Sequence, residues 1–153
     1  MQVYQDVLAE VMRLSPESYV LYHLIPTGLT AQKLILDMLR DPDFKGAYQG
    51  NLGLQQDDLS REVANLGGLL HDIGYFADVE EGNLVKREGF IKDHVEQGVR
   101  YTDWLLRRMD YSCRDRVAQA VGMHNTLTPP FYIETATVFD AGELPTPKGN
   151  WLL

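Results

Sequence analysis

The chain has 153 residues, of which 44% are hydrophobic and 24% are charged, a balance typical of one globular domain and not of a disordered chain. Its 22 acidic residues outnumber its 14 basic residues, so the formal net charge is -8. Proteins that bind extended nucleic acid or an anionic membrane present a basic face, so this balance argues against both kinds of partner. A small anionic substrate remains compatible with it, because a bound metal ion can supply local positive charge.

The single cysteine, Cys113, excludes an internal disulfide and fits a reducing compartment. No other cysteine is available to it and its neighbours are polar, so we expect no chemical role for this thiol. The first residues contain no basic segment and no long apolar run, so neither a secretion signal nor a transmembrane helix is expected. These features together predict a cytoplasmic protein.

Apolar residues recur at helical spacing through most of the chain, which predicts an all-α fold. The first expected helix covers residues 3–14. A second begins at Pro16, because proline is favoured at the first position of a helix. Pro26 and Gly28 are expected to interrupt it before the helical pattern resumes to about residue 40.

The second half of the chain alternates expected loops and helices. Residues 41–57 are rich in Gly, Asp and Gln and predict a loop that could cover a pocket. A second loop is expected over residues 74–87 and a tail over residues 145–149. The adjacent glycines Gly67 and Gly68 are unfavourable inside a helix, and we expect them to mark close packing of two backbones. The helices expected in this half cover about residues 58–70, 88–109, 112–123 and 131–144.

The chain contains four histidines, each on or at the end of a different predicted helix: His23, His71, His94 and His124. Asp72 directly follows His71. Imidazole nitrogen and carboxylate oxygen suit a divalent metal such as Mn, Fe, Co, Ni or Zn, whereas zinc sites built on several thiolates are excluded. Adjacent helical residues point about 100° apart, but near a helix end both can reach one ion. Gly74 fits such an end.

The run from Leu69 to Tyr75 (LLHDIGY) resembles the signature of the HD-domain superfamily of metal-dependent phosphohydrolases, in which a hydrophobic helix ends in a His-Asp doublet. His23 resembles the earlier histidine of this family, at a helix start. Asp140, in the segment VFDAGEL, resembles the later aspartate on a C-terminal helix. The primary metal ligands implied by this resemblance are His23, His71, Asp72 and Asp140.

Two further segments match the family pattern. The segment HVEQG, which starts at His94, resembles its His-x-x-x-Gly helix, and VGMHN, which contains His124, resembles the following histidine-bearing segment. In members that have both, these histidines bind a second metal or contact substrate phosphate. The resemblance therefore implies one or two ions per chain, with Asp72, His94 and His124 as the catalytic side chains.

The five matching segments follow family order over about residues 20–144. We see no internal repeat and no linker. The expected architecture is therefore a single HD domain over residues 1–153, an all-α bundle with five core helices around a metal site. Tyr75 stands where the cyclic-dinucleotide phosphodiesterases of this superfamily carry lysine and the bacterial 5'-nucleotidases carry glutamate. Neither of those substrates is therefore implied.

The resemblance implies hydrolysis of a nucleotide or another small phosphate ester, with a metal-activated water as nucleophile. Basic groups near the metal could neutralise phosphate oxygens, and three such groups precede the third histidine: Lys86, Arg87 and Lys92. The ligand order also resembles that of diiron oxygenases such as myo-inositol oxygenase, which is the alternative enzyme class. A non-catalytic metal or nucleotide sensor is a third interpretation. Homo-oligomerisation is left open by the sequence.

Overall fold

The computed structural model describes residues 2–43, 57–88, 92–128 and 131–143. These residues are largely helical and include one small β-hairpin, so the expected all-α fold is confirmed. None of the described helices is long and apolar enough to span a membrane. Most of the predicted loop 41–57 and the whole predicted tail 145–149 lie outside the described residues. The longer helices are α1 (Gln2–Leu14), α3 (Ile25–Arg40), α5 (Asp57–Leu70), α6 (His94–Arg108), α7 (Arg114–Gly122) and α8 (Ile133–Glu143).

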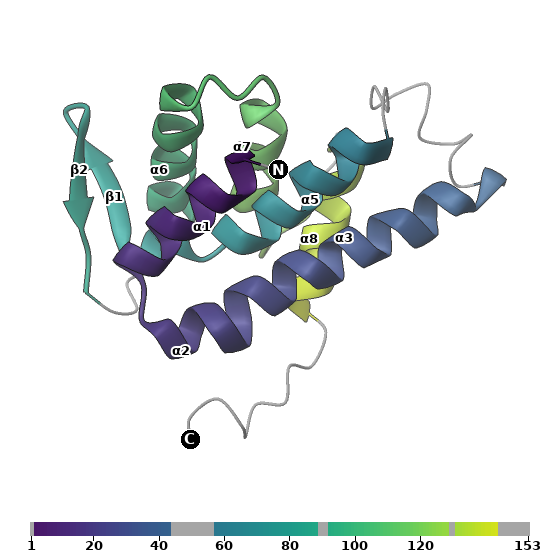
Figure 1. The fold of residues 1–153 in the computed structure, drawn as a ribbon, viewed down its shortest axis with the longest axis horizontal. Coiled ribbons are helices and arrows are strands. Elements are labelled where there is room, and N and C mark those ends of the chain that lie inside the picture. Colours follow the sequence, from purple (N-terminus) through teal and green to yellow (C-terminus); the bar gives the residue numbers. More distant parts are fainter. Residues whose placement is uncertain (1, 44–56, 89–91, 129–130, 144–153) are drawn as a thin grey trace.

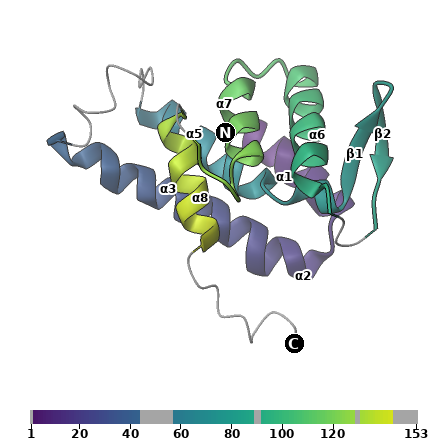
Figure 2. The ribbon, with the colours of Figure 1, turned by 180° about the vertical axis from the view of Figure 1, so that it is seen from behind.

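Helix α5 lies at the centre of the bundle. It packs against α1, α3, α7 and α8. Figure 2, the view from behind, shows α8 lying across α3 and α5, whereas in Figure 1 α3 partly covers α8. The burial of α5 fits this position, because every residue from 63 to 70 is buried, and a helix that is buried on all sides lies inside a core. Its fully buried apolar side chains are Val63, Ala64, Leu66, Leu69 and Leu70. The C-terminal end of α5 therefore lies in the core, and the residues that follow it start from there.

The expected interruption at Pro26 is wrong. The chain is helical from α2 (Glu17–Tyr19) through a π-helical turn, η1 (Val20–Leu24), into α3. In η1 the Ile25 N–H donates to the carbonyl of Val20, five residues earlier. Pro26 then falls in the first turn of α3, where a missing N–H is tolerated. The π-helical turn thus lets the helix continue past Pro26 without a break.

Helices α3 and α5 approach each other closely at glycines. A Cβ atom on Gly68 would lie 2.6 Å from the Gly28 Cα, and one on Gly28 would lie 2.7 Å from the Asn65 carbonyl oxygen. A side chain at either position would overlap backbone. The expectation of close backbone packing is confirmed for Gly68, and Gly28 is its partner and not a helix breaker. A Cβ on Gly67 would instead meet the side chains of Ala120 and Val138.

The loop expected over residues 74–87 is also wrong in part. The 3-10 turn η2 (Ile73–Tyr75) leads into an antiparallel hairpin of β1 (Ala77–Glu80) and β2 (Asn83–Lys86). Glu81 and Gly82 join the strands with φ of 51° and 79°. Two consecutive positive φ values are typical of the tight turns that fit the twist of a hairpin. Each strand has only four residues, too few for an alternating pattern to stand out in the sequence.

The later helices begin somewhat later than expected. Helix α6 begins at His94 and not near residue 88, because Arg87 still bonds to the end of the hairpin through its N–H and the Phe76 carbonyl, 2.7 Å apart. Helix α7 begins after Cys113, whose side chain makes no capping hydrogen bond. Helix α8 forms where expected, although its residues include several that are common in strands.

Candidate metal centre

The His-Asp doublet directly follows the buried end of α5. His71 is 2% exposed and Asp72 is 8% exposed. Asp72 has φ -107° and ψ 10°, so the helix has already ended there. Since the chain turns at this point, the two adjacent side chains can point into the same space. The expected placement of the doublet at a helix end is confirmed.

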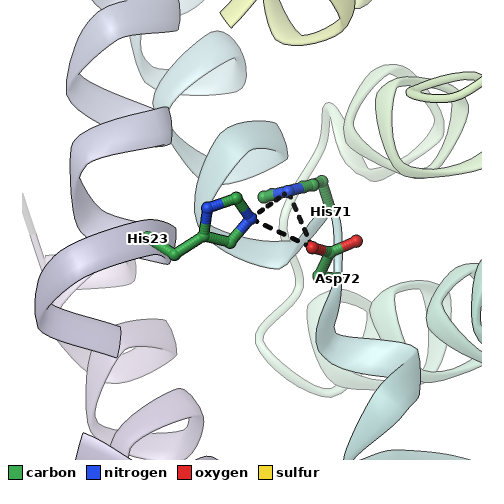
Figure 3. Close-up of side chains that lie close together, drawn as sticks. All are labelled: His23, His71 and Asp72. Atoms are coloured by element: carbon green, nitrogen blue, oxygen red, sulfur yellow. Dashed lines mark hydrogen bonds and ion pairs between the residues drawn. The ribbon is translucent and has the colours of Figure 1, made fainter. Parts of the chain in front are cut away.

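His23 reaches the doublet from the π-helical turn η1. Figure 3 shows its ring facing His71 and Asp72 from the neighbouring helix. Its Nε2 atom lies 3.1 Å from the His71 Nε2 and 3.1 Å from the Asp72 Oδ2. These three side chains offer ligand atoms that lie within 4.8 Å of one another, close enough to hold a metal ion.

His94 and His124 form a second group on the other side of the same carboxylate. Their Nε2 atoms lie 3.3 Å apart, and they lie 3.5 Å and 3.2 Å from the Asp72 Oδ1. This group also meets the spacing that one metal ion needs. Asp72 is therefore shared: its Oδ2 faces one histidine pair, and its Oδ1 faces the other.

The backbone at Gly74 places His94. A Cβ on Gly74 would lie only 1.7 Å from the His94 carbonyl oxygen and 2.6 Å from the Gly98 nitrogen. The first turn of α6 therefore rests directly on the chain segment that follows the doublet. This contact requires a glycine at position 74, whereas a Cβ on Gly98 would first meet the Val121 side chain, at 3.1 Å.

Hydrogen bonds orient two of the histidine rings. The Nδ1 of His71 lies 2.7 Å from the Gly68 carbonyl oxygen, and the Nδ1 of His124 lies 2.6 Å from the Val121 carbonyl oxygen. A carbonyl only accepts, so each Nδ1 carries the proton and donates it. The Nε2 atoms then face the Asp72 carboxylate: a protonated Nε2 donates a hydrogen bond to it, and a deprotonated Nε2 can bind a cation in its place. Histidines that bind metals are oriented in this way.

The carboxyl of Asp72 is held in its charged form. Burial alone would raise its pKa, but the charge of His71 and hydrogen bonds from the surrounding histidines outweigh burial and hold the pKa well below its usual range. Tyr19 donates a hydrogen bond of 2.7 Å from its hydroxyl to the Asp72 Oδ2. Burial raises the pKa of Tyr19, as does the charge of Asp72, so this phenol stays protonated.

A comparison with known protein families gives one result that bears on this geometry. The model of the HD domain family matches residues 20–144, which include all four histidines and the doublet. This chain belongs to the HD domain family. A search of curated proteins and a search of solved structures each gave no match.

The two His/Asp groups of this HD domain, which could each hold a metal ion, border a cavity of about 140 Å³. Three residues that line this cavity were not expected there from the sequence: Tyr75, Asn125 and Gly142. The Tyr75 ring stacks on the His94 ring, with centroids 4.0 Å apart and planes 12° apart. The Asn125 Nδ2 lies 3.5 Å from the His94 Nε2. Neither residue has a spacing in the sequence that signals this role. Tyr19, in contrast, precedes His23 by four residues and thus shares its helix face.

Asp140 is the expected ligand that lies apart from both groups. It is exposed on α8 and belongs to neither cluster among the described residues. Gly142, two residues later, lines the cavity, so this turn of α8 lies at the edge of the site. The role of Asp140 as a metal ligand stays a prediction.

The three basic residues expected near substrate phosphate also lie apart from the described cavity walls. Arg87 pairs instead with Asp78 and Glu80 of the hairpin. Lys86 and Lys92 are exposed. Their contact with a phosphate stays a prediction.

Proposed function

We propose that this HD domain is a metal-dependent phosphohydrolase that acts on a nucleotide or another small phosphate ester. One observation carries the proposal: the Asp72 carboxylate lies between two pairs of histidine Nε2 atoms. The HD domain family consists largely of metal-dependent hydrolases. A donor set of imidazole and carboxylate suits Mn, Fe, Co, Ni or Zn.

The two groups around Asp72 favour two ions per chain. His23 and His71 would hold one ion with the Asp72 Oδ2, and the other histidine pair would hold a second ion with the Oδ1. Bound there, a divalent cation lowers the pKa of a coordinated water towards neutrality and polarises the phosphoryl oxygen. Asp72 stays anionic at neutral pH, and its negative charge would attract a cation to each of the two histidine pairs.

Other side chains would act on the substrate. Asn125 and Tyr75 line the cavity beside His94, so they are placed to contact a phosphate or its leaving group. The Asn125 amide offers N–H donors, which can stabilise phosphate oxygens without adding charge. Water would enter through the same cavity, since the histidine pairs form its inner wall.

A diiron oxygenase is the second candidate. The same observation supports it, because four imidazoles and one shared carboxylate also suit a pair of iron ions. It differs from the hydrolase in needing oxygen and in leaving phosphate esters intact. Oxygen uptake by the iron-loaded protein is the measurement that separates the two.

The test begins with the metal content of the purified chain, measured per protein molecule. The protein is then loaded with Mn²⁺, Co²⁺, Ni²⁺ or Fe²⁺ and assayed on p-nitrophenyl phosphate and a panel of nucleotides. We expect one ion for each of the two His/Asp groups, and hydrolysis of at least one phosphate ester. The Asp72→Asn variant should lose both. The control Asp103→Asn removes a carboxylate that pairs with Arg107 on the surface of α6, away from the cavity, and should keep both.

Each contrary outcome has a meaning. Bound metal without hydrolysis across the panel rejects the phosphohydrolase. If iron-loaded protein also consumes oxygen, the oxygenase takes its place. Tight nucleotide binding with no turnover of any kind indicates a sensor.

A further inference from the structure

The orientation of Asp72 needs a support that is independent of the histidines. Its two oxygens serve different histidine pairs, so a rotation of the carboxylate would disturb both. All four histidines lie within 3.5 Å of this carboxylate, and the Tyr19 hydroxyl donates a hydrogen bond to it.

Tyr19 is itself held firmly. It is 8% exposed, and its ring meets the edge of Phe76 with centroids 5.4 Å apart and planes 67° apart. On its other side it lies against the His23 ring, at 4.9 Å between centroids. Tyr19 and His23 come from one helical segment and both reach the Asp72 Oδ2. The hydroxyl is therefore a fixed donor aimed at one chosen oxygen.

We propose that Tyr19 is a positioning residue of the metal centre: its hydroxyl fixes the rotation of the Asp72 carboxylate so that one oxygen faces each histidine pair. This inference rests on the proposed metal centre. Tyr19 does not bind the ion in this arrangement, because its hydroxyl proton points at the carboxylate. A residue that orients a metal ligand through a hydrogen bond, without binding the ion itself, typically lowers metal affinity about 10- to 100-fold when it is removed.

The test compares Tyr19→Phe with the wild type and with Tyr101→Phe. Tyr101 is a suitable control because its ring is fully buried and its hydroxyl has no hydrogen-bond partner among the described residues. Each protein is titrated with Co²⁺ against a competing chelator, and its visible absorption spectrum is recorded. Unfolding by urea in the absence of metal gives the stability of each protein separately.

We expect Tyr19→Phe to bind Co²⁺ about 10- to 100-fold more weakly than the wild type. Its Co²⁺ spectrum should change as well, because a carboxylate that has rotated alters the geometry at the ion. Tyr101→Phe should match the wild type in affinity and spectrum. A purely structural role of Tyr19 would lower the stability but leave the spectrum of the bound ion as it was.

The outcomes separate the two proposals. If the wild type binds Co²⁺ and Tyr19→Phe binds it with the same affinity and spectrum, the positioning role is overturned and the metal centre stands. If the wild type binds no divalent ion, both proposals fail. Should Tyr19→Phe not fold, Tyr19→3-fluorotyrosine keeps the ring and the hydroxyl but strengthens the donor. An unchanged Co²⁺ spectrum in that protein would overturn the inference.

Discussion

The two histidine pairs on either side of Asp72 have the same chemistry but different supports. His23 and His71 come from η1 and the end of α5, and the Tyr19 hydroxyl bonds to the oxygen they face. His94 and His124 come from α6 and the turn after α7, and the backbone contact at Gly74 supports His94. A backbone carbonyl orients one ring on each side, so the two sides differ in the Tyr19 hydroxyl on the one and in the packing at Gly74 on the other. Asp72 is the member they share, so changes elsewhere should act on one side at a time.

The largest expected effects come from the histidines themselves. His71→Ala and His124→Ala should each lower metal affinity on their own side by more than about 100-fold, since a ligand matters more than its hydrogen-bond partner. The metal content measured by native mass spectrometry should fall from two ions per chain to one in either variant. If a single substitution removes both ions, the two histidine pairs do not bind their ions independently, and the difference between their supports has no separate effect.

Gly74→Ala should disturb only the side of His94. The new Cβ would overlap the His94 carbonyl oxygen, so the start of α6 must move. We expect a loss of about 3 kcal/mol in the free energy of unfolding, together with weaker binding of one ion. Urea unfolding and metal titration measure the two effects. Gly142→Ala is the matched control for the unfolding measurement, because a Cβ there meets nothing within 4 Å. Equal losses of stability in the two variants would contradict the steric account.

The hairpin holds α6 through a charged contact that should respond to pH. Hydrogen bonds from Arg100, the nearer at 2.9 Å, hold the pKa of Asp78 below its ordinary value of 3.8. A lowered pKa in the folded state means that this contact stabilises the fold above pH 3.8 and is lost as the pH falls through the folded-state pKa.

The Asp78→Asn substitution tests this contact. It should lower the free energy of unfolding at pH 7 by about 1.5 kcal/mol, a modest figure because Arg100 is half exposed. Urea unfolding of the metal-free protein should show the gap between variant and wild type narrowing towards pH 3. A gap that stays constant over this range would show that the charge of Asp78 is not its source.

The smallest effect is expected for Tyr75→Leu. It removes the ring that stacks on His94 at 4.0 Å. Such a contact contributes about 0.5–1.5 kcal/mol, which corresponds to roughly a 2- to 10-fold loss of affinity for one ion. Co²⁺ titration measures it, and Tyr132→Leu is a control for loss of an aromatic ring, because the Tyr132 ring lies against Arg116 and does not line the cavity. A loss on the side of His23 instead would show that the stack supports the whole site.

Local spacing accounts for the part of the structure that could be predicted. Apolar residues at three- and four-residue intervals predict the helices. This spacing gives each helix one face to bury, whichever helix it packs against. The doublet could be placed at a helix end because glycine follows it closely. The HD domain resemblance is confirmed by the family match over residues 20–144. The hairpin after η2 was missed because its strands are short and bear charges on both faces.

The sequence by itself determined which donors exist: four histidines and the aspartate of the doublet, with no competing thiolate pair. Only the tertiary structure decided how they share one carboxylate, because the two histidine pairs lie on helices far apart in the chain. It also decided that Tyr19 is a partner of Asp72, across 53 positions of sequence, and that Asp140 lies outside both groups. Spacing along a helix determines which side chains share a face, whereas packing between helices determines which faces meet.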